Sequence, residues 1–248
     1  MRFVLLTALG VGGATMLGAV LGFLLLPLVR RYGAVVLGFG GGVMLGSTFW
    51  GLIEPALFYG GEHAVFVTVS GLIVGAVGLA LLERRLPPLP GEGARDKGET
   101  ASGAGRALLL VPAIALHNLP EGIAAGVGFA TDNMGQALLI AGGIALQNLP
   151  EGAVIIAPML AAGVSRKKTL LLACLTGAVE VVGVLIGCAA ALSVGFLLPL
   201  SLALAGGCML LVVCREVIPE MQENGAKNAP VAALFAGFCL MLIFSELL

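Results

Sequence analysis

The chain has 248 residues, of which 59% are hydrophobic and 11% are charged, and its formal net charge is −1. Because soluble domains carry about 25% charged residues, this composition excludes a soluble fold and predicts an all-α integral membrane protein. Nucleic-acid binding is excluded as well, since the sequence has no basic run and no basic patch interleaved with aromatic residues.

Eight apolar segments lie between charged or turn-rich breaks, and each is long enough to cross a bilayer core of about 30 Å. In chain order they cover 3–29, 34–58, 63–83, 107–130, 136–162, 169–192, 196–219 and 229–248. The break around Ser193 to Pro199 is the weakest of the seven. We therefore expect a single transmembrane domain over 1–248, with eight transmembrane helices embedded in the lipid bilayer.

The largest break, at about 84–106, combines proline, glycine and mixed charges, which cannot form a packed core. We expect a flexible cytoplasmic loop there. Since basic residues mark the cytoplasmic side, their distribution predicts a multi-pass protein of the cell (inner) membrane with both termini outside the cytoplasm. Eleven of the thirteen basic residues lie in odd-numbered connections: Arg30, Arg31, Arg84, Arg85, Arg95, Lys97, Arg106, Arg166, Lys167, Lys168 and Lys227.

Glycines recur at four-residue spacing inside several apolar segments. This spacing exposes bare backbone along one face of a helix and so favours close packing between helices in lipid. The sequence predicts helix contacts at Gly18 and Gly22, at Gly38, Gly42 and Gly46, at Gly71 and Gly75, and at Gly183 and Gly187.

The fourth and fifth segments contain nearly the same phrase. IALHNLPEG at 114–122 and IALQNLPEG at 144–152 agree at eight of nine positions. Consecutive spans run in opposite directions, so we expect the two copies to face one another at the bilayer midplane as an antiparallel pair. This arrangement is an inverted repeat centred on helices four and five, which is typical of a transporter site.

The residue types in the phrase suit a metal ion. A glutamate at the midplane costs several kcal/mol, so Glu121 and Glu151 need a cation or a proton. His117 and Glu121 are separated by four residues and Asn118 and Glu121 by three, which places them on one helix face. A lone membrane histidine or asparagine more often bonds a neighbouring helix, but two copies with a carboxylate each favour a site for a borderline divalent metal such as zinc.

The paired phrases resemble those of the ZIP (Zrt-, Irt-like protein) family of divalent metal transporters, in particular its prokaryotic GufA-like branch. The resemblance implies a binuclear metal centre on the fourth and fifth helices and transport of metal into the cytoplasm. It also implies both termini outside, a homodimer and an elevator-like movement. The substrate ions implied are mainly Zn²⁺, with Cd²⁺, Fe²⁺ and Mn²⁺ in some members.

The same resemblance suggests the ligands of the two ions. The first ion would be held by His117, Glu121, Gln147 and Glu151, with Met44 nearby. The second would be held by Asn118, Glu121, Asn148 and Glu151, with Glu180 of the sixth segment completing it. Many relatives have histidine at position 147 and some have aspartate at position 148, so the neutral amides of Gln147 and Asn148 predict weaker binding.

Other charged residues in or near the spans have two interpretations each. Arg215, Glu216 and Glu220 either pair with one another or gate the inner mouth of the pathway. Glu54, near the outer end of the second segment, either attracts cations or faces water. Glu62 and His63 either capture metal before entry or form a solvated turn.

The sequence therefore predicts a carrier that moves a divalent transition metal, with Zn²⁺ as the expected substrate, and not an enzyme. A passive divalent cation channel is the nearest alternative, and saturation of metal flux would separate the two. A membrane-embedded metalloenzyme is a weaker alternative because HExxH is absent and no nucleophile stands out. A GxxxxGK[ST] phosphate loop is also absent, so ion gradients or the membrane potential would drive transport.

Overall fold

The computed structural model describes residues 2–84, 118–129, 133–161, 163–193, 198–222 and 228–247. Every regular element in these ranges is a helix. Seven helices within them are long and apolar enough to cross a membrane. The expected fourth segment is described only from residue 118 onward, and the expected loop at 84–106 lies outside the described residues after Arg84.

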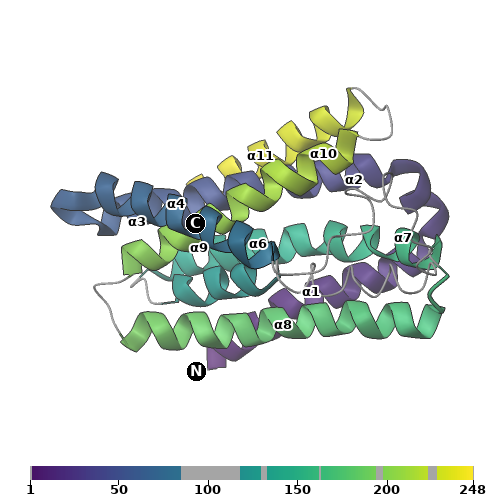
Figure 1. Cartoon of the computed structure of the whole chain (residues 1–248), viewed down its shortest axis with the longest axis horizontal. Coiled ribbons are helices and arrows are strands. Elements are labelled where there is room, and N and C mark those ends of the chain that lie inside the picture. Colours follow the sequence, from purple (N-terminus) through teal and green to yellow (C-terminus); the bar gives the residue numbers. More distant parts are fainter. Residues whose placement is uncertain are drawn as a thin grey trace.

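The chain forms its elements in the following order (Figure 1). The first half contains α1 (Arg2–Leu24), α2 (Leu26–Gly46), the π-helix η1 (Ser47–Ile53), α3 (Glu54–Tyr59), η2 (Gly61–His63) and α4 (Ala64–Glu83). Residues 118–128 are helical. The remainder contains α6 (Met134–Val154), α7 (Ile156–Ala161), α8 (Arg166–Ser193), α9 (Leu198–Val212), the π-helix η4 (Val213–Val217), α10 (Ile218–Gln222) and α11 (Ala229–Leu247).

Most span limits agree with those expected, but the first break does not. The chain turns at Leu25, several residues before the expected break after residue 29. Pro27 explains the earlier position, because it lies in the first turn of α2. A proline lacks a backbone N–H and its ring clashes with the carbonyl four residues earlier, so it starts a helix more readily than it continues one.

The helices form two groups. One group, which we call the motif bundle, consists of α1, residues 118–128, α6 and α8, and α1 packs along both α6 and α8. The second group, the flanking helices, pairs α2 with α11 and α4 with α9. The groups meet where α6 contacts α2 and η1. In Figure 1, α3 and α4 project beyond the motif bundle at one end of the molecule.

All four predicted glycine faces are confirmed as helix contacts. Gly18 and Gly22 of α1 lie against the backbone of α6, and Gly183 and Gly187 of α8 lie against residues 119–123. Gly38, Gly42 and Gly46 pack on α11, and Gly71 and Gly75 pack on α9. An added Cβ at most of these positions would collide with a carbonyl of the neighbouring helix. These glycines therefore allow the backbones to approach within van der Waals contact.

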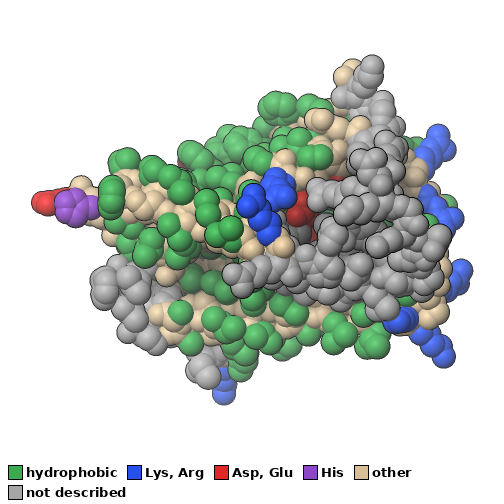
Figure 2. Space-filling view, viewed as in Figure 1, with side chains coloured by type: hydrophobic (Ala, Val, Ile, Leu, Met, Phe, Trp, Pro, Cys, Tyr) green, Lys and Arg blue, Asp and Glu red, His purple; other side chains and the backbone are tan. Residues whose placement is uncertain are grey.

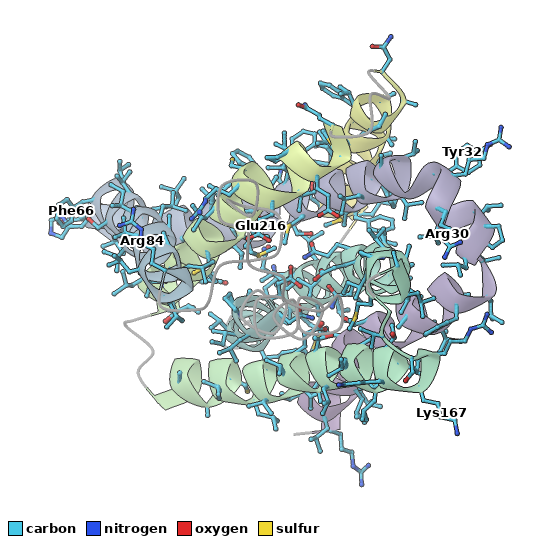
Figure 3. All side chains as sticks on the ribbon, turned by 45° about the vertical axis from the view of Figure 1, so that its right-hand side comes forward. Arg30, Tyr32, Phe66, Arg84, Lys167 and Glu216 are labelled. Carbon is cyan, nitrogen blue, oxygen red and sulfur yellow. The ribbon has the colours of Figure 1, made fainter. Side chains whose placement is uncertain are left out.

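The two ends of the molecule differ in charge. Arg30 and Lys167 lie at the same end, and Phe66 lies at the opposite end (Figure 3). Basic side chains gather at the first of these ends in the space-filling view (Figure 2). Both chain termini lie away from the turn between α1 and α2 (Figure 1). α1 thus ends near the basic end, and α8 begins there.

Candidate functional site

Glu180 forms the centre of a buried polar cluster in the motif bundle. Its side chain is 0% exposed and lies in the middle of α8. Oε1 accepts a hydrogen bond from Thr15 Oγ1 of α1 at 2.5 Å and one from Asn118 Nδ2, while Oε2 accepts one from Asn148 Nδ2 of α6 at 2.5 Å. The carboxylate therefore joins three other helical segments of the bundle.

A second contact joins the two copies of the repeated phrase. Gln147 Nε2 of α6 donates to Glu121 Oε1 of residues 118–128 at 2.8 Å, and both side chains are buried. Glu121 also interacts electrostatically with Glu151 and Glu180. The two phrases are therefore in contact through this hydrogen bond, and their arrangement as an inverted repeat stays a prediction. Three carboxylates and three amides thus share a small region of the apolar bundle.

Several oxygens in this cluster have no hydrogen-bond partner among the described residues. They are Asn118 Oδ1, Glu121 Oε2, Gln147 Oε1 and Asn148 Oδ1. Buried polar atoms are nearly always paired, because leaving one unpaired costs about 1–3 kcal/mol. Each orphaned atom belongs to a residue of the repeated phrase, and each is an oxygen. Such a set is chemically suited to coordinate a cation.

The remaining candidate ligands are placed as follows. Glu151 is half-buried on α6, and His117 lies outside the described residues. Met44 of α2 is buried in the hydrophobic cluster that also contains Ile140 and Ile144 of α6. In the described ranges, no three His, Cys, Asp or Glu side chains are grouped so that they could hold a metal ion. Among the described residues, the unpartnered oxygens of this cluster are those of three amides and of Glu121.

The other charged candidates lie in separate parts of the molecule. Glu54 is exposed at the start of α3, and His63 is exposed in η2. Arg215 and Glu216 lie in η4, and Glu216 is half-buried. Glu220 of α10 borders a cavity of about 480 Å³ between the start of α2 and the region of α7.

Two features of the cluster were not predicted from the sequence. Thr15 lies in a weakly patterned apolar helix, and no local signal linked it to Glu180. Gly122 and Gly152 end the two phrases, and each packs on a neighbouring backbone: Gly122 on the carbonyl of Glu180, and Gly152 on that of Thr15. The occurrence of glycine at the same place in both copies was a signal for this close approach.

Comparisons with known proteins identify the family of the chain. A family model described as the ZIP zinc transporter matches residues 89–245. The chain belongs to the ZIP family. Membership in this family of transporters confirms the prediction that the chain is a transporter and not an enzyme.

Similar ZIP proteins include several bacterial members. The zinc transporter GufA of Myxococcus xanthus is 35% identical over 188 residues, covering 75% of this chain and 72% of GufA. The zinc transporter ZIPB of Bordetella bronchiseptica is 36% identical over 154 residues, covering 61% of this chain and 49% of ZIPB. The zinc transporter ZupT of Corynebacterium glutamicum is 34% identical over 197 residues, covering 75% of this chain and 74% of ZupT. The match to GufA supports the GufA-like branch.

Proposed function

We propose that this ZIP-family chain carries a divalent transition metal, with Zn²⁺ as the main substrate, across the membrane into the cytoplasm. The observation that carries the proposal is the set of four unpartnered buried oxygens on the two repeated phrases. A cation between the phrases would give these oxygens a partner and would offset the charge of the glutamates. The names of the similar proteins support zinc in particular.

The proposed centre is binuclear. One ion lies among His117, Glu121, Gln147 and Glu151, on the side toward Met44. The other lies among Asn118, Glu121, Asn148 and Glu151, beside Glu180. Glu121 and Glu151 belong to both sets, so their negative charges stabilise both ions. The mixture of amide, carboxylate and one imidazole ligand suits Zn²⁺ as the main substrate. Cd²⁺, Fe²⁺ and Mn²⁺ are proposed as secondary substrates.

Transport then requires alternating access to this centre. We propose that the motif bundle moves against the flanking helices, carrying the ion with it. A polar contact at the boundary between the groups would break in that step: Gln136 Nε2 of α6 donates to Trp50 O of η1 at 2.9 Å. Gln136 Nε2 also donates to a second carbonyl, Gly51 O, at 3.4 Å. The residue four positions after Gly51 is Pro55, which has no backbone N–H to donate to that carbonyl.

The orientation of the chain and the ends of the pathway are inferred from the charges, and transport into the cytoplasm is what the family resemblance implies. We assign the end with Arg30 and Lys167 to the cytoplasm (Figure 3). Glu54 and His63 then lie toward the outer entrance, and Arg215, Glu216 and Glu220 toward the inner exit. A homodimer in the inner membrane remains a prediction of the family resemblance.

Uptake by purified protein in proteoliposomes tests the proposal. Vesicles containing a metal-sensitive dye are given Zn²⁺, Cd²⁺, Fe²⁺ or Mn²⁺, and the initial rate is followed against concentration. Saturation with slow turnover indicates a carrier, whereas a rate that rises linearly indicates a channel. Glu121→Ala and Glu151→Ala should abolish uptake, while Glu246→Ala, which removes an exposed carboxylate near the end of α11, should leave it unchanged. Full uptake by both site variants would refute the site.

A further inference from the structure

We propose that the cavity beside the start of α2 binds the headgroup of an anionic phospholipid. Two arginines of α2 hold the phosphate, and the apolar part of the cavity wall receives the first carbons of an acyl chain. The inference goes beyond the proposed function, because binding of this lipid requires neither the metal ion nor the movement of the motif bundle.

The cavity lies where the two groups of helices meet. Its volume is about 480 Å³, which is within the range of about 300–1,000 Å³ typical of ligand pockets. Its wall is formed by α2, by the end of α6 with α7, and by Glu220 of α10, which packs on α2. Gly33 of α2 is part of this wall, and a Cβ added to it would meet no atom within 4 Å. The space beside Gly33 is therefore large enough to receive further atoms.

The charged groups of the cavity favour an anion with a single negative charge. Arg30 and Arg31 line the cavity from α2, and Glu220 lines it from α10. Among the described residues of the wall these are the only charged ones, so two positive charges and one negative charge leave a formal net charge of +1. A phosphodiester carries one negative charge, and the planar guanidinium group is well suited to bind two phosphate oxygens at once.

The position of the cavity and its other residues favour a lipid over a soluble phosphate ester. Arg30 lies at the basic end of the molecule (Figure 3), where positive side chains attract the anionic headgroups of a membrane. Tyr32 also lines the cavity, and its ring centroid lies 5.3 Å from Cζ of Arg31. Tyrosine is typical of the membrane–water interface. The wall formed by α6 and α7 is apolar and consists of Val154, Ala157, Pro158 and Ala161.

These two kinds of wall match the two parts of a phospholipid. A phospholipid joins a charged phosphate directly to apolar chains, and the cavity places guanidinium groups beside an apolar wall. A soluble phosphate ester would use only the arginines and would leave the apolar wall uncovered. Since burial of each CH₂ group contributes further to binding, the lipid is the occupant that satisfies the whole cavity.

Lipid binding to the detergent-purified full chain tests the inference in the absence of metal. Phosphatidylglycerol, which carries one negative charge, is titrated against the protein, and the bound lipids are counted by native mass spectrometry. Phosphatidylcholine with the same acyl chains is the comparison, because its headgroup has no net charge. Wild type should retain one phosphatidylglycerol at concentrations at which phosphatidylcholine is not retained. Equal retention of the two lipids would overturn the inference.

Charge variants test the role of the two arginines. Each basic side chain beside an anionic headgroup should change the affinity about five-fold, so Arg30→Gln combined with Arg31→Gln should weaken phosphatidylglycerol binding about thirty-fold. Lys167→Gln combined with Lys168→Gln is the matched control. Both lysines are exposed near the start of α8, at the same end of the molecule as Arg30 (Figure 3), and neither lines the cavity. Equal weakening in both double variants would indicate a general attraction to the basic end and would refute the site.

A steric variant tests the location without changing the charge. Gly33→Leu places an apolar side chain in the cavity and should abolish retention of phosphatidylglycerol at the concentration that loads wild type. Gly78→Leu is the control, because Gly78 of α4 also has no atom within 4 Å of an added Cβ but does not line the cavity. Normal binding by Gly33→Leu would contradict the assignment. If Gly33→Leu is not recovered folded, the charge variants decide the question.

Competition experiments separate the lipid from related ligands. Glycerol 3-phosphate, a soluble ester with the same phosphate chemistry, should not displace phosphatidylglycerol at equal concentration, and displacement would assign the cavity to a soluble phosphate and overturn the lipid. Phosphatidylethanolamine should bind less tightly than phosphatidylglycerol. Equal affinity would mean that Glu220 pairs with the ammonium group, and the choice of an anionic lipid would be wrong. None of these measurements involves metal uptake, so their failure leaves the proposed function unchanged.

Discussion

Asn148→Asp tests the orientation of the amides most directly. In the structure Asn148 donates to Glu180 Oε2 at 2.5 Å and to Val11 O at 3.3 Å. Aspartate has the same shape, but an ionised aspartate has no hydrogen to donate. The substitution therefore replaces two attractive contacts by oxygens facing oxygens, without changing the size of the side chain.

The expected cost can be estimated from these contacts. A hydrogen bond to a charged group contributes about 1.5–3 kcal/mol and one to a carbonyl about 0.5–1.5 kcal/mol. Two carboxylates about 4 Å apart repel by about 4 kcal/mol at an effective dielectric constant of about 20. The metal-free variant should therefore be destabilised by roughly 6–8 kcal/mol, a large share of a typical stability of about 5–15 kcal/mol. A divalent cation between the carboxylates should reverse most of this loss.

Thermal unfolding of the detergent-purified chain measures both effects. In the presence of a chelator, Asn148→Asp should melt at least about 10 °C below wild type. Saturating Zn²⁺ should raise its Tm by more than it raises that of wild type. Asn133→Asp is the control, because Asn133 Oδ1 accepts from Gly135 N and Gln136 N at the start of α6 and aspartate can do the same. Equal melting of wild type and Asn148→Asp in chelator would refute the assigned amide orientation.

Three further predictions concern selectivity, topology and packing. Gln147→His should lower the half-saturation concentration for Zn²⁺ and Cd²⁺ more than for Mn²⁺, because imidazole favours borderline metals; uptake assays measure this. In a cysteine-free background, an impermeant maleimide should label Lys167→Cys only from the cytoplasm and Glu62→Cys only from outside. Gly42→Ala should destabilise the protein by about 1–3 kcal/mol, seen as a lower Tm, because its Cβ would collide with the α11 backbone.

Each of these predictions has a control or a contrary outcome. Equal gains for all three metals in Gln147→His would show that the side chain at position 147 does not face the ion. The reverse labelling pattern would refute the orientation and the direction of uptake. Gly33→Ala is the control for packing, because Gly33 also lies on α2 but has no atom within 4 Å of the added Cβ. Its Tm should equal or exceed that of wild type. If Gly42→Ala had the same Tm as Gly33→Ala, the packing argument would be contradicted.

The sequence alone determined the features that depend on short-range patterns. Apolar length set the spans, because a helix must cross about 30 Å of hydrocarbon whatever its neighbours are. Glycine spacing marked the contact faces, because residues four apart lie on one side of any α-helix. The repeated phrase predicts Glu121 and its partners as metal ligands, because residues three or four apart share one helix face. The early break at Leu25 was not predicted, because Arg30 and Arg31 are a stronger sign of a span end than the single proline Pro27.

Tertiary structure decided which of these faces meet and how the polar groups are oriented. Thr15 and Glu180 are 165 residues apart, and no local pattern connects them. The side-chain amides of Asn118 and Asn148 can turn either the oxygen or the nitrogen toward an ion. The residue type alone therefore does not determine which atom faces the ion. That choice follows from Glu180, which accepts hydrogen bonds and thereby draws the amide nitrogens toward itself. The physical reason is that an amide has a donor side and an acceptor side, and only the neighbour supplied by packing selects between them.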